Sequence, residues 1–183
     1  MAHVGDLPPV QRHITTHRSD GKAVFDTSIP TESKTAALPD NMGFALSYAT
    51  SGFPISLSSS NDIATYYDYL SSPPGLSISN GSVLRHVDFA PGMTSAMHRT
   101  VSLDYGIVLE GEMDLVLDSG EERRMRRGDC AVQRGTMHSW RNASKTDWAR
   151  MVFVLLPCEP ILGDDGKPLG EELDTFEGVR ASS

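Results

Sequence analysis

The sequence predicts an all-β protein with a sandwich or barrel, and the second half of the chain carries the pattern. From Ser82 onward, apolar-rich runs such as "VLRHVDF", "YGIVLEG" and "ARMVFVLLP" follow one another with turn residues between them. Their spacing of about 8 to 12 residues is typical of all-β sandwiches and barrels. Two runs within "LEGEMDLVLDSGEERRMRRGD" meet across an Asp-Ser-Gly turn at 118–120, which predicts a β-hairpin.

Residues 1–81 are predicted to form an extended arm that packs on this barrel. The β-rich segments "VQRHITTHR" and "KAVFDTSI" are separated by the turn signal "SDG", and "FALSYATSGFPI" predicts a further strand. The segment "NDIATYYDYL" predicts a short helix with Asn61 or Asp62 as its N-cap. Its apolar positions are Ile63, Tyr66, Tyr67 and Leu70.

The chain therefore divides into the arm at 1–81, a barrel core at 82–157 and an acidic, glycine-rich tail at 158–183. We expect residues before about Thr50 to add strands to a sheet edge, because an uncovered edge invites uncontrolled pairing. The strands are added either within the chain or by exchange across a two-fold homodimer. The tail either lies along the barrel or stays mobile.

The composition limits the classes of function. A chain of 183 residues can bury one core, and its formal net charge of −8 argues against nucleic acid or an anionic membrane as partner. No apolar run approaches the ~20 residues needed to span a bilayer, and the N-terminus lacks the apolar segment of a secretory signal. The only cysteines, Cys130 and Cys158, are too few for a disulfide framework, so we expect reduced thiols and a cytoplasmic location.

Two motifs carry a resemblance to a known family. "GMTSAMHRTVSLDYGIVLEG" and "GDCAVQRGTMHSWRN" resemble the two conserved motifs of the cupin superfamily. The first places Gly92, His98, Thr100, Asp104 and Gly111 on the family positions, and the second places Gly128, Gln133, Gly135, His138 and Asn142. The resemblance implies a double-stranded β-helix, or jelly-roll, barrel with the arm and one or two short helices added.

Three positions depart from the family motifs. Thr100 stands in place of the second histidine of His-x-His, Asp104 in place of a glutamate, and Gln133 in place of a proline. The resemblance then leaves His98, Asp104 and His138 as ligands, which is the composition of a 2-His-1-carboxylate site for a divalent metal such as Zn, Fe, Ni or Mn. The alternative is a metal-free pocket in which the same three residues act as acid, base and orienter.

Neighbouring side chains are placed by the alternation of a strand. In "SVLRHVDF", Arg85 shares a face with Val83, Val87 and Phe89, so it either points into the barrel as a clamp for a substrate carboxylate or enolate, or forms a salt bridge at the rim. Trp140 alternates with His138 and forms either an aromatic wall or plain core. We assign no catalytic role to the remaining histidines, which are His3, His13, His17 and His86.

The resemblance implies an enzyme acting on a small molecule of secondary or aromatic metabolism, like the compact single-domain cupins of natural-product pathways. The expected reaction is non-redox: decarboxylation, dehydration or isomerisation of an enolisable carbonyl compound, with His98, Asp104, His138 and Arg85 as catalytic residues. One alternative is a metal-dependent dioxygenase, and Thr100 argues against it. Another is a barrel that binds a small ligand without catalysis.

Overall fold

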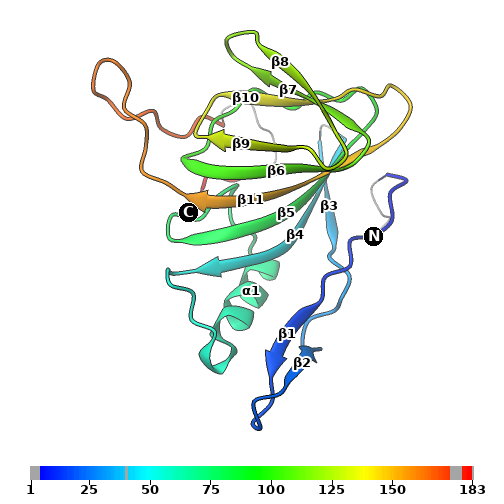
Figure 1. The fold of residues 1–183 in the computed structure, drawn as a ribbon, viewed down its shortest axis with the longest axis vertical. Helices are drawn as coiled ribbons and strands as arrows, with labels where there is room; N and C mark the ends of the chain where they lie inside the picture. Colours follow the sequence, from blue (N-terminus) through cyan, green and yellow to red (C-terminus); the bar gives the residue numbers. More distant parts are fainter. Residues whose placement is uncertain (1–4, 40, 174–178, 183) are drawn as a thin grey trace.

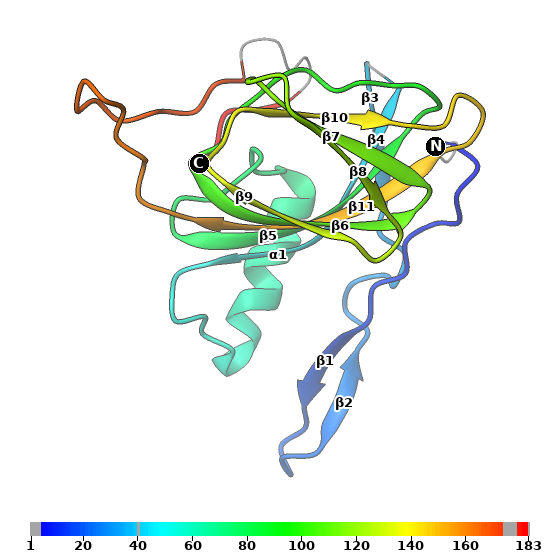
Figure 2. The same cartoon turned by 45° about the horizontal axis from the view of Figure 1, so that its top comes forward.

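The computed structural model describes residues 5–39, 41–173 and 179–182, and in them two curved antiparallel sheets face each other. The larger sheet has the order β3 (Thr35–Leu38), β4 (Met42–Ser51), β5 (Gly81–Phe89), β11 (Ala149–Pro157), β6 (Ser102–Glu110) and β9 (Cys130–Arg134). The smaller sheet has the order β10 (His138–Asn142), β7 (Glu112–Leu117) and β8 (Glu122–Arg126). Figure 2 shows the smaller sheet lying across the concave side of the larger one. The predicted all-β jelly-roll fold is confirmed.

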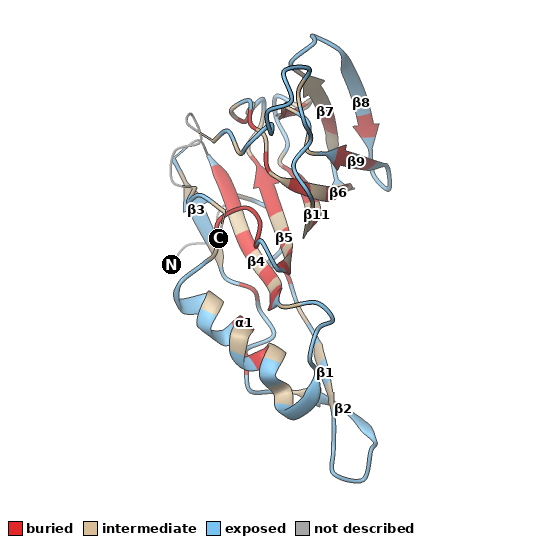
Figure 3. Ribbon diagram, turned by 90° about the vertical axis from the view of Figure 1, so that its left-hand side faces the viewer, coloured by how far each residue is buried: buried red, intermediate tan, exposed pale blue. Residues whose placement is uncertain are grey.

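The interior between the sheets is filled by side chains that alternate along the strands. On β5 the inward positions include Val83, Val87 and Phe89, and each is almost fully buried. Val87 and Phe89 share one apolar cluster with Met151 of β11 and Met113 of β7, whereas Val83 belongs to a second cluster with Leu155. Figure 3 shows this buried band running along β4 and β5.

Two residues of the motifs hold the strands together rather than line a site. Gly111 joins β6 to β7 at φ 76°, and a Cβ there would lie 2.9 Å from the Cβ of Ala149, so only glycine fits. Asn142 Nδ2 donates to the main-chain oxygens of Phe89, Ala90 and Asp147 at 2.8 to 3.1 Å. These contacts connect the end of β5 with β10, which fixes the two sheets relative to each other.

The arm contributes to the large sheet within the same chain. β4 pairs antiparallel with β5 from Met42↔Phe89 to Ser51↔Gly81, and β3 pairs with the outer edge of β4. The large sheet therefore continues across the boundary predicted at residue 82. A separate hairpin of β1 (Ile14–His17) and β2 (Ala23–Asp26) projects from the body of the molecule (Figure 1). Exchange of an arm across a homodimer remains a prediction.

The predicted helix is α1 (Asn61–Ser71), preceded by the short 3₁₀ helix η1 (Ser58–Ser60). Its N-cap is Ser60, so the prediction of Asn61 or Asp62 as the cap is wrong. The physical reason is that Asp62 has a partner on another element: its carboxylate accepts a hydrogen bond from the Tyr48 hydroxyl of β4 at 2.6 Å. Tyr66 donates to the Leu46 oxygen at 2.7 Å, which also ties α1 to β4.

The tail returns to the barrel. The main chains of Arg99 and Glu172 exchange two hydrogen bonds at 2.9 and 3.0 Å, and the Ser77 hydroxyl donates to Ser182 Oγ at 2.9 Å. The tail therefore lies along the barrel over the part that the structure describes. Within the described ranges, no helix is long and apolar enough to cross a membrane.

Candidate active site

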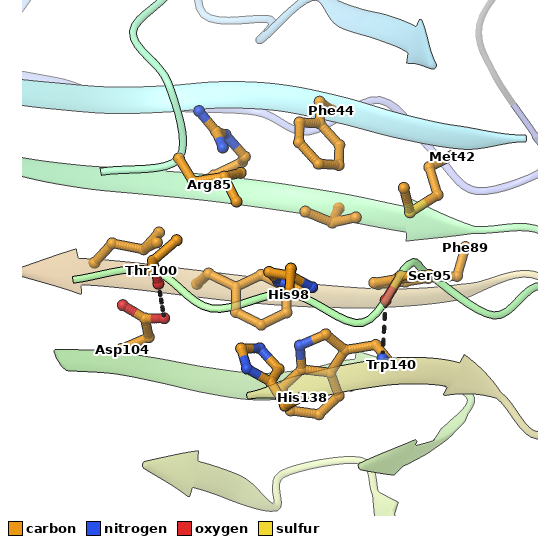
Figure 4. Close-up of a pocket in the computed structure, with 14 residues that line it drawn as sticks. Met42, Phe44, Arg85, Phe89, Ser95, His98, Thr100, Asp104, His138 and Trp140 are labelled. Carbon is orange, nitrogen blue, oxygen red and sulfur yellow. Dashed lines mark hydrogen bonds between the residues drawn. The ribbon is translucent and has the colours of Figure 1, made fainter. Parts of the chain in front are cut away.

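A pocket lies between the two sheets, beside β5, β6, β10 and β11. Its lining contains all four predicted catalytic residues, His98, Asp104, His138 and Arg85, together with Thr100. Most of the other lining side chains are apolar, including Phe44, Leu76, Phe89 and Phe153. Figure 4 shows these side chains converging from different strands on one space. An apolar lining with few polar groups is typical of a small-molecule site.

The two imidazoles are brought together by a short pairing between the β5–β6 connection and β10. His98 and His138 each donate a main-chain N–H to the other's main-chain oxygen at 2.9 Å, and their ring centroids lie 4.4 Å apart. His98 lies in an isolated bridge rather than a regular strand, yet Thr100 still shares its inward side. Arg99, between them, points outward and pairs with Glu172 at 3.0 Å, as the alternation predicts.

Both imidazoles are held as neutral rings with a defined tautomer. Nδ1 of His98 lies 2.9 Å from the Ala96 oxygen, and Nδ1 of His138 lies 2.9 Å from the Thr136 oxygen. A carbonyl oxygen only accepts, so each Nδ1 carries the proton and Nε2 is the basic atom. Burial lowers the pKa of His98, and burial followed by the neighbouring His98 lowers the pKa of His138 to about 3. Neither ring is charged at neutral pH.

Asp104 has the opposite electrostatic character. Its Oδ2 accepts a hydrogen bond of 3.4 Å from Thr100, whose hydroxyl accepts one of 2.7 Å from Ser102. Its Oδ1 is buried and has no hydrogen-bond partner among the residues that the structure describes. Burial raises the pKa of Asp104 to about 6, while the hydroxyls of Ser102 and Thr100 act in the other direction. The carboxyl group therefore titrates near neutral pH, and one of its oxygens is left for a proton or a ligand.

Arg85 is an inward-facing cation. Its side chain lies on the pocket side of β5, and the residue is only 6% exposed, so the alternative of a rim salt bridge is wrong. Its Nη2 donates to the Gly75 oxygen at 2.9 Å, and its Cζ lies 5.0 Å from the ring centroid of Phe44. Burial lowers the pKa of Arg85 to about 10, so the guanidinium stays charged at neutral pH.

The positions of the three predicted metal ligands decide whether they could share one metal ion. No group of three or more His, Cys, Asp or Glu side chains in the described ranges could hold a metal ion. The two imidazoles lie side by side, whereas Asp104 is hydrogen-bonded to Thr100, and an aspartate reaches one methylene less far than the glutamate of the family motif. As placed here, His98, Asp104 and His138 do not fit a three-ligand site. A bound divalent metal remains a prediction from the sequence.

Other sequence predictions concern the surroundings of the pocket. Trp140 lines it and stands edge-on to His138 with centroids 5.7 Å apart, as an aromatic wall would. His86 lies on the other face of β5, where its Nδ1 is 2.7 Å from Ser47 Oγ. His3 lies outside the described residues. Met42 and Phe44 also line the pocket, and no sequence pattern pointed to them, because they come from β4, which lies outside both motifs.

The fold and this pocket define the class of protein as a cupin. The family model described as "Cupin domain" matches residues 85–155. "Phomopsin biosynthesis cluster protein C'" of Diaporthe leptostromiformis is 54% identical over 165 residues, which cover 90% of this chain and 87% of that relative. The chain belongs to the cupin family.

Two further proteins illustrate the range of similarity. "Cupin-domain-containing oxidoreductase fogC" of Aspergillus ruber is 44% identical over 181 residues, covering 97% of this chain and 85% of that relative. The solved structure of KdgF from Halomonas sp. has a TM-score of 0.46 and 16% identity, and it covers 69% of this chain and 89% of that one.

Proposed function

We propose that this chain is an enzyme of a secondary-metabolite pathway that moves a proton on a small enolisable carbonyl compound, as a lyase or isomerase without a redox step. Phomopsin biosynthesis cluster protein C' supports the pathway context, because its name assigns that relative to a biosynthesis cluster. The pocket supports the chemistry. A single observation carries the proposal: Asp104 Oδ1 is buried, lacks a partner among the described residues, and belongs to a carboxyl group with a pKa of about 6.

Asp104 is the general base. A carboxylate with a pKa near the working pH combines a usable ionised fraction with useful basicity, whereas both imidazoles are held as weak bases. Oδ1 removes a proton from the carbon next to the carbonyl group, and the electron pair of the broken C–H bond forms an enolate. The same carboxyl group then returns the proton to another carbon, which completes an isomerisation, or to a β-hydroxyl group that leaves as water. In a decarboxylation no α-proton is removed: the C–C bond to the carboxylate breaks, carbon dioxide leaves, its bonding pair forms the enolate, and the protonated Asp104 supplies the proton to that carbon.

The imidazoles and Arg85 handle the charge that develops. Nε2 of His98 and of His138 are hydrogen-bond acceptors in the neutral tautomer, so they orient a hydroxyl or enol proton of the substrate. Arg85 remains a cation inside an apolar pocket, where its attraction for a developing enolate is stronger than in water. No step is routed through a metal ion, because the described ligands do not fit one.

Solvent exchange tests the proposal without knowledge of the substrate. Purified protein is incubated in D₂O with a panel of β-keto acids and aromatic ketones, and loss of the α-proton signal is followed by NMR. We expect catalysed exchange that rises with pH through about 6, because Asp104 acts in its ionised form. Absence of exchange across a panel whose members bind to the protein contradicts the proposal and favours a non-catalytic ligand-binding role.

A second candidate function is that of an oxidoreductase. It is supported by the name of one relative, "Cupin-domain-containing oxidoreductase fogC". The two candidates differ in their need for an electron acceptor. Exchange and product formation are therefore compared under air and under nitrogen, with oxygen consumption and the metal content of the protein measured in parallel. Product formation that stops under nitrogen, in a protein that contains iron or copper, favours the oxidoreductase. Unchanged exchange under nitrogen favours the non-redox enzyme.

A further inference from the structure

We propose that the substrate of this pocket is an amphipathic carboxylate, whose anionic group is bound by Arg85 and whose apolar part extends past Phe44 into an outer groove. The inference rests on the proposed function only for the place of the reacting carbon, which faces Asp104. The binding claim stands on the surroundings of Arg85 and on the composition of the groove.

Among the described residues, Arg85 has no anion of the kind that a buried guanidinium needs. It forms one hydrogen bond, to Gly75, and takes part in no ion pair with a carboxylate of the described residues. The other buried arginine of the same sheet, Arg150, shows the usual solution: it donates through Nε and Nη2 to both oxygens of Asp88 at 2.5 and 2.7 Å. Arg85 has five N–H donors in a planar fork that matches a carboxylate. Because no described carboxylate pairs with this fork, a ligand carboxylate can bind it.

The Phe44 contact does not replace an anion. An aromatic face attracts a cation, but more weakly than a carboxylate that accepts two hydrogen bonds. Phe44 and Arg85 instead lie at the boundary of two spaces, because both line the active-site pocket and also line a second, outer groove. A ligand bound at Arg85 therefore lies next to both spaces.

The outer groove has the composition that an apolar chain ending in an anion requires. Its apolar lining comes from β3, β4, α1 and the segment after α1, and includes Ala36, Leu38, Leu46, Tyr67 and Leu70. Its lining residues within the described ranges include three other cations, Arg12, Lys34 and Arg180, and one carboxylate, that of Glu32. The chain as a whole has a formal net charge of −8, so this local excess of positive charge attracts an anion that the rest of the surface repels.

The test measures binding rather than turnover. Isothermal titration calorimetry compares 4-butylbenzoate with 4-butylbenzamide, which has a similar shape without the charge, and with unsubstituted benzoate. We expect the wild type to bind 4-butylbenzoate about 30-fold or more tighter than the amide, because the amide leaves the buried cation unpaired. We also expect it to bind 4-butylbenzoate more tightly than benzoate, because the butyl group is buried in the groove.

The variants locate the two contacts. Arg85→Gln should abolish the preference for the carboxylate over the amide, and Arg85→Lys should keep part of it. Arg99→Gln is the matched control, because Arg99 points outward to Glu172, and it should leave the preference unchanged. Ala36→Trp, at an exposed position paired with Phe44 across β3 and β4, should remove the advantage of 4-butylbenzoate over benzoate.

Equal affinity of the wild type for carboxylate and amide overturns the proposal, and so does an Arg85→Gln protein that folds and keeps the preference. If Arg85→Gln does not fold, the Arg85→Lys variant and the comparison of carboxylate with amide in the wild type still test the proposal. Asp104→Asn separates the two claims: it should bind 4-butylbenzoate at least as tightly as the wild type while losing proton exchange. A wild type that shows the carboxylate preference but no exchange contradicts the proposed function and leaves the binding inference supported.

Discussion

The two faces of the large sheet differ in whether buried charged side chains have partners among the described residues. On the face away from the pocket, Arg150 and Asp88 are direct partners across β11 and β5, with two hydrogen bonds between them and a third from Arg150 to the Pro8 oxygen at 2.8 Å. On the pocket face, Arg85 lacks a carboxylate partner among the described residues, and Asp104 Oδ1 lacks a hydrogen bond there. Arg85 and Asp88, which represent the two situations, lie close together on the same strand, β5.

The difference shows how to read buried charge in this fold. In a buried ion pair the partner offsets the free energy of desolvation of each charge. Removal of one partner therefore lowers the free energy of unfolding. A charge without a partner destabilises the folded state and persists where a ligand supplies the missing partner. We therefore expect changes on the outer face to alter stability, and changes on the pocket face to alter chemistry and binding.

The largest effect should come from Asp104→Asn on the pocket face. Asparagine has nearly the same shape but cannot accept the substrate proton, so α-proton exchange should fall by about 10² to 10⁴-fold. NMR exchange in D₂O measures the rate. The control is Asp114→Asn, which changes a carboxylate held by Arg124 and Arg141 outside the pocket lining and should leave the chemical step intact. Full exchange in Asp104→Asn would move the base elsewhere in the pocket.

The next effect should be Asp88→Asn on the outer face. It leaves Arg150 buried without its anion, so the free energy of unfolding should fall by about 3 to 5 kcal/mol. Urea denaturation measures this change, and affinity for 4-butylbenzoate in the folded protein should be unaltered. The double variant Asp88→Leu/Arg150→Met should recover much of the loss, because no charge is left unpaired. An unchanged free energy of unfolding in Asp88→Asn would contradict the comparison of the two faces.

The pH dependence of stability should differ between wild type and Asp104→Asn. The folded pKa of Asp104 lies above its ordinary value, so its favourable contribution is complete below about pH 4 and is lost as the pH rises through about 6. Relative to the variant, the wild type should therefore lose about 2 to 3 kcal/mol of stability between pH 4 and 7. Parallel denaturant titrations at several pH values measure the difference. A constant difference across this range would show an ordinary, solvated carboxyl group.

Arg85→Met should give a smaller change of opposite sign to Asp88→Asn. Arg85 has no carboxylate partner among the described residues, so removing its buried charge relieves its desolvation, and the free energy of unfolding should stay the same or rise by about 1 kcal/mol. Thermal and urea denaturation measure stability, and calorimetry should show loss of carboxylate binding. A clear loss of stability would mean that Arg85 supports the fold through Gly75 and Phe44.

The smallest effect should come from Thr100→Val. The Thr100 hydroxyl donates to Asp104 Oδ2 over 3.4 Å, which is a weak bond that favours the ionised carboxylate. Its removal should move the midpoint of the pH–exchange profile upward by about half a unit, with the plateau rate nearly unchanged. A shift to lower pH would show that the hydroxyl acts on the protonated form.

Much of the fold and the identity of the pocket residues could be predicted from local patterns. Alternation placed Trp140 on the same side as His138 and Arg99 outward, and the hairpin formed at 118–120, whereas Arg85 was left open between the pocket and the rim. These predictions hold because a strand has a fixed period of two and a short turn has few conformations. The helix was also found, but its N-cap was wrong because Asp62 bonds to Tyr48 on another element.

The sequence by itself indicated that His98, Thr100, Asp104 and His138 reach the pocket, because the two motifs set their spacing along the chain. Tertiary structure alone decided their chemical states. The neutral imidazoles follow from the Ala96 and Thr136 oxygens and from burial, and the raised pKa of Asp104 follows from a low-dielectric setting that no local pattern encodes. It also decided that Arg150 has an anion and that Arg85 is left without one among the described residues, because a partner far along the chain depends on how the strands pair.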